Sequence, residues 1–300
     1  LCGRERLQDG DDDMDRLSGG LSDSEGGGLN GGGIRAQLVE NNPFASSAAP
    51  NPWDNANPDI DSLNRAVVEH IDQLLRTKRK TPAEPLAGVV LGEAGAGKTH
   101  TLKRVLGRIR ESGEIAIFVT VKAFMDPESV MRDLLREVFI SMAREHRGGK
   151  LQIDLLLEEL DESYRECCRE EGRPVRSGLD RLRSLQMQLL EVDRDFLRCL
   201  LLYADTEDAS LKEDILFWLM GESDESFPER LKVPDCDRDA MAPKAREDEA
   251  SKMLLSLGHV LRYARVPMLV CFDQLDGMDS PDLINAWGKV LSLLVNDVSG

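Results

Sequence analysis

The segment Gly92–Thr99 most constrains what this chain can fold into. Its sequence, Gly-Glu-Ala-Gly-Ala-Gly-Lys-Thr, has two glycines five positions apart followed directly by Lys-Thr. The apolar run Leu86–Leu91 precedes it and predicts a short strand covered on both faces. A helix is predicted to follow, from about Lys98 to Arg110. This order of strand, glycine-rich turn and helix is typical of an α/β fold with a parallel sheet.

The residue types in this segment suit a polyphosphate. Glycines let main-chain N–H groups turn inward, and the helix start adds free N–H groups and the positive end of its dipole. Lys98 is predicted to reach the β- and γ-phosphates, and the Thr99 hydroxyl to bind Mg²⁺, which prefers oxygen ligands. We therefore predict ATP binding with magnesium at Gly92, Glu93, Ala94, Gly95, Ala96, Gly97, Lys98, Thr99 and His100. A glycine-rich turn with an incidental lysine is the alternative.

A second pattern lies far along the chain, at Met268–Asp273. A buried apolar strand that ends in a carboxylate suits Mg²⁺ coordination, so Thr99 and Asp273 are the predicted metal ligands. The alternative is that Asp273 only caps the turn that follows the strand.

Hydrolysis also needs a group that orients or deprotonates the attacking water. Gln274 follows Asp273 and can orient water, although an amide is a poor base. Asp276 is the better carboxylate candidate, unless it is a solvated loop acid. The predicted catalytic residues are therefore Lys98, Asp273, Gln274 and Asp276.

Composition predicts four segments along the 300 residues. We expect a disordered Gly/Asp-rich tail with a Pro/Asn-rich linker, the first part of a nucleotide-binding core, an acidic helical insertion, and the continuation of the core, at residues 1–57, 58–149, 150–248 and 249–300. Phe44 and Trp53 in the linker are expected either to pin it onto the core or to lie in an extended stretch.

Periodicity and turn residues predict the remaining elements. Helices are expected from Asp59 or Asp61 to the basic run Lys78–Lys80, and then over 126–145, 211–220, 249–264 and 281–295. Further strands are expected over 115–120 and 268–272, and leucine stripes over 151–160 and 179–196 predict helices of the insertion.

Charge separates the insertion from the core. The formal net charge is -17, and residues 150–248 hold 26 acidic and 15 basic residues. The core segments are neutral, so the chain lacks the basic excess of a duplex-binding surface, and a nucleic-acid surface on the insertion is not expected. A small local basic patch remains compatible with these numbers.

The chain shows no sign of a membrane or an oxidising compartment. No apolar run approaches the roughly 20 residues that a membrane helix needs. Six cysteines at irregular spacings indicate free thiols in a reducing environment. We therefore expect a cytoplasmic protein.

The phosphate loop, the strand after it and the Asp273–Asp276 strand end together resemble P-loop ATPases of the AAA+/STAND type. The helix Asp61–Arg76 resembles the N-terminal helix of the origin-recognition-like branch, and Ile215–Gly221 resembles ATPases of bacterial conflict systems (BREX-like). The resemblance implies a three-layer α/β/α fold with the phosphate strand at the centre of a parallel sheet. It also implies ATP hydrolysis that drives work in an assembly with protein partners or further copies. DNA is implied only by analogy with the family.

Such domains continue with a sensor strand and arginine-bearing helices, which do not occur before Gly300. We therefore expect a fragment with an incomplete sheet, in which the arginine finger and the second sensor cannot be located. The predicted function is a nucleotide-driven switch or motor ATPase. A small-molecule kinase and a non-hydrolytic nucleotide-binding scaffold are the alternatives.

Overall fold

The computed structural model describes residues 52–53, 64–81, 86–90, 97–122, 126–234, 238–273 and 280–298. All of these residues belong to one compact unit, which spans residues 48–300.

A parallel pair of strands lies at the centre of this unit. β1 (Ile117–Lys122) pairs with β4 (Met268–Asp273) in a register that begins at Ile117 opposite Met268 and ends at Lys122 opposite Asp273. A small antiparallel hairpin of β2 (Glu145–Arg147) and β3 (Lys150–Leu151) follows the first helix after β1. Parallel strands are usually covered on both faces, and side chains alternate between the two faces of each strand.

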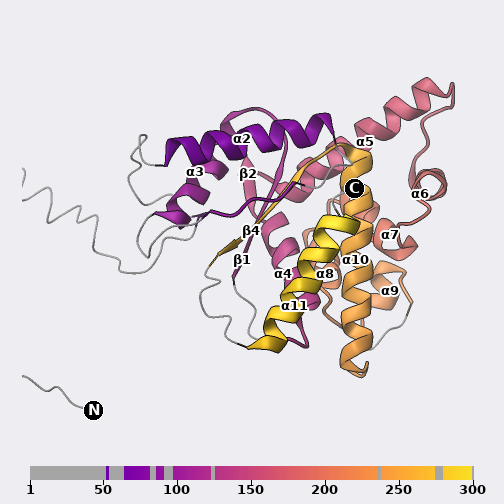
Figure 1. Cartoon of the computed structure of the whole chain (residues 1–300). Coiled ribbons are helices and arrows are strands. Elements are labelled where there is room, and N and C mark those ends of the chain that lie inside the picture. Colours follow the sequence, from indigo (N-terminus) through magenta and orange to yellow (C-terminus); the bar gives the residue numbers. More distant parts are fainter. Residues whose placement is uncertain are drawn as a thin grey trace, which may run out of the picture. The chain divides into compact units, whose positions relative to one another are not determined.

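Two helices cover one face of the sheet, α2 (Arg65–Lys80) and α3 (Lys98–Glu111) (Figure 1). Their apolar stripes meet alternate residues of the strands in one buried cluster, made of Val68, Leu75, Val105, Leu106, Ile109, Ala116 and Phe118. Leu269 and Cys271 of β4 pack against the same cluster. This layer also holds the start of α3, where the glycine-rich segment ends.

The opposite face carries the larger core. Ile117, Val119 and Val121 point into it from β1, and Met268, Val270 and Phe272 pack against it from β4. The elements on this side are α4 (Val130–Met142), α5 (Gln152–Glu170), α6 (Gly178–Gln188), α7 (Arg194–Asp205), α8 (Ala209–Leu219), α9 (Phe227–Leu231), α10 (Pro243–Ala264), α11 (Pro281–Ser292) and the π-helical turn η2 (Leu293–Val298). The unit is therefore a three-layer α/β/α arrangement with a small parallel sheet, as predicted.

The helices of 150–248 share this core rather than forming one of their own. Phe139 of α4 meets Phe196 of α7 edge to face, with ring centroids 6.2 Å apart. Both side chains are fully buried, and α10 packs against α4 and α5 on the same side of the sheet.

One buried side chain closes the outer edge of β1. The Oε1 of Gln152 accepts the Phe118 N–H at 2.7 Å, and its Nε2 donates to the Phe118 carbonyl at 2.9 Å. The same Nε2 donates to the Ser141 carbonyl at 2.8 Å. Gln152 therefore satisfies main-chain groups that another strand would otherwise pair.

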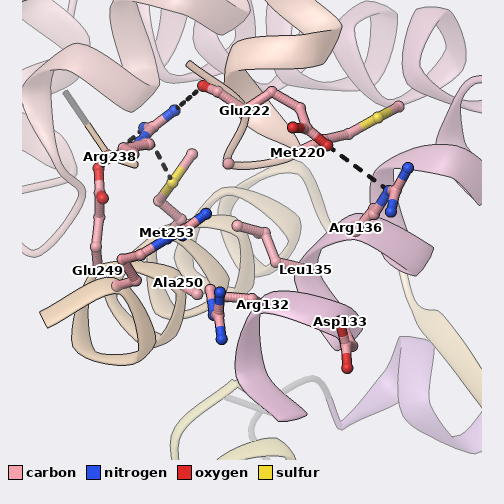
Figure 2. A pocket seen from close by; sticks show the side chains of 12 residues that line it. Arg132, Asp133, Leu135, Arg136, Met220, Glu222, Arg238, Glu249, Ala250 and Met253 are labelled. Carbon is pink, nitrogen blue, oxygen red and sulfur yellow. Dashed lines mark hydrogen bonds and ion pairs between the residues drawn. The ribbon is translucent and has the colours of Figure 1, made fainter. Parts of the chain in front are cut away.

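A cavity of about 210 Å³ between α4, α8 and α10 is lined by four arginines (Figure 2). Arg238, almost wholly buried, donates to Glu249 at 2.9 Å and to the carbonyls of Trp218 and Glu222. The other three guanidinium groups also face carboxylates, in the pairs Arg132–Glu247, Arg136–Glu222 and Arg246–Asp239. Since every arginine that lines the cavity has a carboxylate partner, these ion pairs connect the helices around the cavity to one another.

The predicted strand over Leu86–Leu91 is wrong for the residues that the structure describes. Residues 86–90 have no strand geometry and are exposed, with Val89 83% exposed. A parallel strand needs a neighbour to satisfy its main chain, and none of the described strands pairs with this segment. The sheet that is described consequently does not have the phosphate strand at its centre.

Several element boundaries also differ from the predictions. The helix expected from Asp126 begins at Val130, because Asp126 accepts the Glu128 N–H at 2.9 Å and closes a turn first. The single leucine stripe over 179–196 is two helices, α6 and α7, separated by a turn. The helix expected from residue 249 begins at Pro243, where proline suits the first turn. The strand expected over 115–120 spans 117–122.

Candidate functional site

The start of α3 is built on a left-handed glycine. Gly97 has φ 81°, a conformation that strains any residue with a Cβ, and it is the N-cap residue of α3. Its carbonyl accepts the Thr101 N–H at 2.9 Å and the Thr101 hydroxyl at 3.0 Å. The chain thereby turns sharply into the helix and puts Lys98 and Thr99 in the first turn.

Thr99 and Asp273 meet although they lie 174 residues apart in sequence. The Thr99 hydroxyl donates to the Asp273 carboxylate over 2.8 Å. Because β1 and β4 are parallel and in register, Asp273 lies at the carboxyl end of the sheet. The first turn of α3 lies at this same end, which is where ligands bind in open α/β sheets.

Two further contacts fix the surroundings of α3. Asn64, which precedes α2, donates through Nδ2 to the Thr101 hydroxyl at 3.0 Å, so the two helices of this layer are joined beside the turn. Trp53 donates through Nε1 to the Thr120 hydroxyl at 3.3 Å, and its ring meets Phe118 edge to face. Of the two expectations for Trp53, the structure therefore favours the one in which it is pinned onto the core.

Cys271 lies two residues before Asp273 and is not a nucleophile. Burial, with a further contribution from the negative charge of Asp273, raises the pKa of its thiol to about 12. The thiol therefore stays protonated at neutral pH and acts as a small packing residue.

The structure brings together only part of the predicted site. Lys98, Thr99 and His100 lie in the first turn of α3, and Asp273 lies opposite Thr99. The other predicted site residues fall outside the described residues: Gly92, Glu93, Ala94, Gly95, Ala96, Gln274 and Asp276.

Asn64 was missed by the sequence analysis. Its only sequence signal was its residue type, which is common at helix starts. In the structure its side chain makes no cap hydrogen bond to α2 and bonds to Thr101 instead. Local patterns cannot show such a contact, since its partner lies in the next helix.

Two negative findings concern metals and membranes. In the described part of the chain, no three or more His, Cys, Asp or Glu side chains gather as a metal site. None of the helices described is both long and apolar enough to cross a membrane.

Residues 83–176 match the family model described as AAA domain. No curated protein and no solved structure matches this chain. The matched range includes the glycine-rich segment, α3, β1, α4 and α5, and it ends before β4, so the position of Asp273 rests on the structure alone. Together with the α/β/α fold, the match supports a nucleotide-binding P-loop ATPase of the AAA type.

Proposed function

We propose that this chain binds ATP with magnesium at the carboxyl end of its sheet and hydrolyses it as a nucleotide-driven switch or motor in a larger assembly. The observation that carries the proposal is the 2.8 Å contact between the Thr99 hydroxyl and the Asp273 carboxylate. Side chains of these two types, one from a helix start and one from a neighbouring strand end, hold the metal in P-loop nucleotide sites.

The residues present fit magnesium. A hydroxyl and a carboxylate are oxygen ligands of the kind that Mg²⁺ prefers, and here they lie within hydrogen-bond distance of each other. When bound, the metal neutralises charge on the phosphates. The chain itself would bind the triphosphate through the main chain of Gly92–Gly97 and through Lys98, with His100 beside it in the first turn of α3.

The same proposal gives roles to the two residues after β4. Gln274 orients the attacking water, and Asp276 accepts its proton. The helices of residues 150–248 share one core with α4 and α10, so in this proposal they pass changes at the sheet to protein partners or to further copies in the cytoplasm.

Binding is the first test. We expect Lys98→Ala and Asp273→Asn to weaken the affinity for magnesium–ATP by at least about tenfold, or ~1.4 kcal/mol, because each removes a charge that faces the ligand. Lys289→Ala removes an exposed lysine of α11 and is the matched control. Titration calorimetry with and without EDTA also separates the two roles. Asp273→Asn should bind equally well in both conditions, whereas Lys98→Ala should keep its dependence on the metal. Unchanged affinity in both variants would overturn the proposal.

Turnover is the second test. Phosphate release from ATP is measured beside transfer of the γ-phosphate to metabolites, and Gln274→Ala and Asp276→Ala are expected to slow release without weakening binding. Transfer to a metabolite would identify a kinase instead. Tight binding without any turnover would identify a scaffold.

A further inference from the structure

The two sides of the sheet differ strongly in charge. The helices α2 and α3 together hold ten basic and three acidic residues, although the chain has a net charge of -17. Both helices cover the same face of the sheet (Figure 1). Residues 150–248, which pack on the opposite face, hold 26 acidic and 15 basic residues. The neutral total of the core segments therefore conceals a basic layer at α2 and α3, and the acidic excess of residues 150–248 lies on the other face of the sheet.

The basic layer contains a groove, which we name the α2–α3 groove. Its cavity measures about 540 Å³, and Arg76, Lys103, Arg104 and Arg108 line it together with Asp72 and Glu111. Gly107 also lines the groove, and a Cβ added there would meet nothing within 4 Å, so the cavity has room for a partner's side chains. Arg76 pairs with Asp72 at 3.1 Å, yet its side chain remains 64% exposed.

A segment of complementary negative charge, residues 205–229, lies on the opposite face. We name it the α8–α9 segment. It holds nine acidic residues and one basic residue, Lys212, and Arg230, the next residue of α9, pairs with Asp214. Glu207, Glu213, Glu225 and Glu229 are exposed. Phe217 of α8 is 44% exposed as well, which gives this surface an apolar side chain among its carboxylates.

We propose that the α2–α3 groove of one copy binds the α8–α9 segment of a second copy. The two surfaces lie on opposite faces of the sheet, so each copy carries both halves of the contact and the association is head to tail. Opposite charges at such a contact favour encounter and fix its orientation. The proposal is independent of the nucleotide site, whose residues it does not use.

A nucleic acid is the competing occupant, and the lining argues against it. Two carboxylates, Asp72 and Glu111, lie among the cations of the groove, and each would repel a continuous phosphate backbone. Protein side chains of both signs can instead satisfy such a mixed lining. The net charge of -17 also opposes approach of a polyanion from a distance.

The experiment compares two charge-reversed proteins. The groove variant carries Arg76→Glu, Lys103→Glu and Arg108→Glu, and the segment variant carries Glu213→Lys, Glu225→Lys and Glu229→Lys. A control with Lys244→Glu, Arg262→Glu and Lys289→Glu changes the net charge as the groove variant does, at exposed positions elsewhere. Sedimentation velocity measures association of each full chain in low and in high salt.

We expect the wild type and the control to associate at low salt, where the Debye length is about 14 Å. Both should dissociate at high salt, where the Debye length is about 4 Å. Each reversed variant alone should associate at least about tenfold more weakly. An equimolar mixture should restore association, because the segment variant supplies an intact groove and the groove variant an intact segment. A misfolded variant could not restore association in this way.

Three results would overturn the proposal. The wild type could remain monomeric at low salt, the groove variant could associate as the wild type does, or the mixture could fail to restore association. Titration with a single-stranded oligonucleotide tests the competing occupant. Loss of oligonucleotide binding in the groove variant, with self-association unchanged, would assign the groove to nucleic acid.

Discussion

At the scale of single residues, Gly258 shows a position where a methyl group is too large. A Cβ built on this residue of α10 would lie 2.8 Å from the main-chain oxygen of Val298 and 2.9 Å from its Cα. These atoms belong to the main chain of η2, so they cannot move aside as the end of a flexible side chain could. The close approach lets η2 lie directly against α10.

We expect Gly258→Ala to lower the free energy of unfolding by roughly 1–3 kcal/mol, because the added methyl group forces η2 away. Gly288→Ala in α11 is the matched control, since a Cβ there meets nothing within 4 Å. In a helix, exchanging glycine for alanine at an open position should stabilise the fold by up to about 1 kcal/mol. Urea unfolding compares the two, and equal effects would contradict the steric argument.

His146 of β2 is a second informative residue. Burial, with the positive charges of Arg110 and Arg147 adding to it, lowers the pKa of His146 from 6.5 to about 4. The folded protein thus keeps this imidazole neutral at a pH where the unfolded chain binds a proton. Its contribution to stability is complete above pH 6.5 and is lost as the pH falls towards 4.

We expect the wild type to lose at most about 3 kcal/mol more stability than His146→Gln between pH 7 and pH 4, because only the wild type has this histidine to protonate on unfolding. His70→Gln changes an exposed histidine of α2 and should keep the steep dependence. Denaturant midpoints over this pH range give the comparison. Parallel curves for the wild type and His146→Gln would rule out the assigned pKa.

At the scale of elements, α4 is capped by a residue from a distant helix. Glu247 of α10 accepts the Met131 N–H at 2.9 Å and the Arg132 N–H at 3.3 Å. The N-cap residue Ser129 makes no cap hydrogen bond through its side chain. A carboxylate at this end of a helix also interacts favourably with the helix dipole. The acid that stabilises the start of α4 therefore comes from outside its own sequence.

Glu247→Ala should cost about 1–2 kcal/mol, which is typical for removal of a helix cap. Ser129→Ala is the control from the local sequence and should change stability by only a few tenths of that, since its hydroxyl bonds to Asp133 instead. Thermal unfolding followed by circular dichroism compares the two variants. If Ser129→Ala were the more damaging, capping by Glu247 would be wrong.

These elements also show what a sequence can predict. The apolar run and terminal carboxylate of Met268–Asp273 are local signals, and β4 spans these residues. The apolar periodicity of α8 likewise predicted a helix within two residues of its observed bounds. Capping by Glu247 could not be predicted, because its bond to Arg132 joins residues 115 positions apart. Two local motifs predict Thr99 and Asp273 as ligands of one metal, and the structure brings them into contact through the pairing of β1 with β4.

At the scale of the whole unit, one continuous core joins the insertion to the helices that cover one face of the sheet. Residues from α4, α5, α7, α8, α10 and α11 belong to a single buried cluster. Trp218 of α8 is a fluorescent probe of this cluster, and the guanidinium carbon of Arg238 lies 4.8 Å from the centroid of its ring. Trp287 of α11 is a second probe, and the centroids of its ring and of the Phe272 ring lie 4.6 Å apart.

We expect residues 150–248 to unfold together with the sheet, because no boundary in the core separates them. Two variants that retain only Trp218 or only Trp287, with the other tryptophans changed to Phe, test this. For each variant, the urea midpoint of the fluorescence transition is compared with the midpoint of its own circular dichroism curve. The two midpoints should coincide in both variants. Separate midpoints would mean that the insertion is an independent folding unit.

The side chain of Gln152 has a consequence for how this sheet can be completed. With the main chain of Phe118 already occupied, β1 has no free hydrogen-bonding groups there for a newcomer. Among the described residues, β4 pairs only with β1, so its far side is the edge at which extension is open. A strand that joins next to Met268–Asp273 would change the surroundings of Asp273 directly.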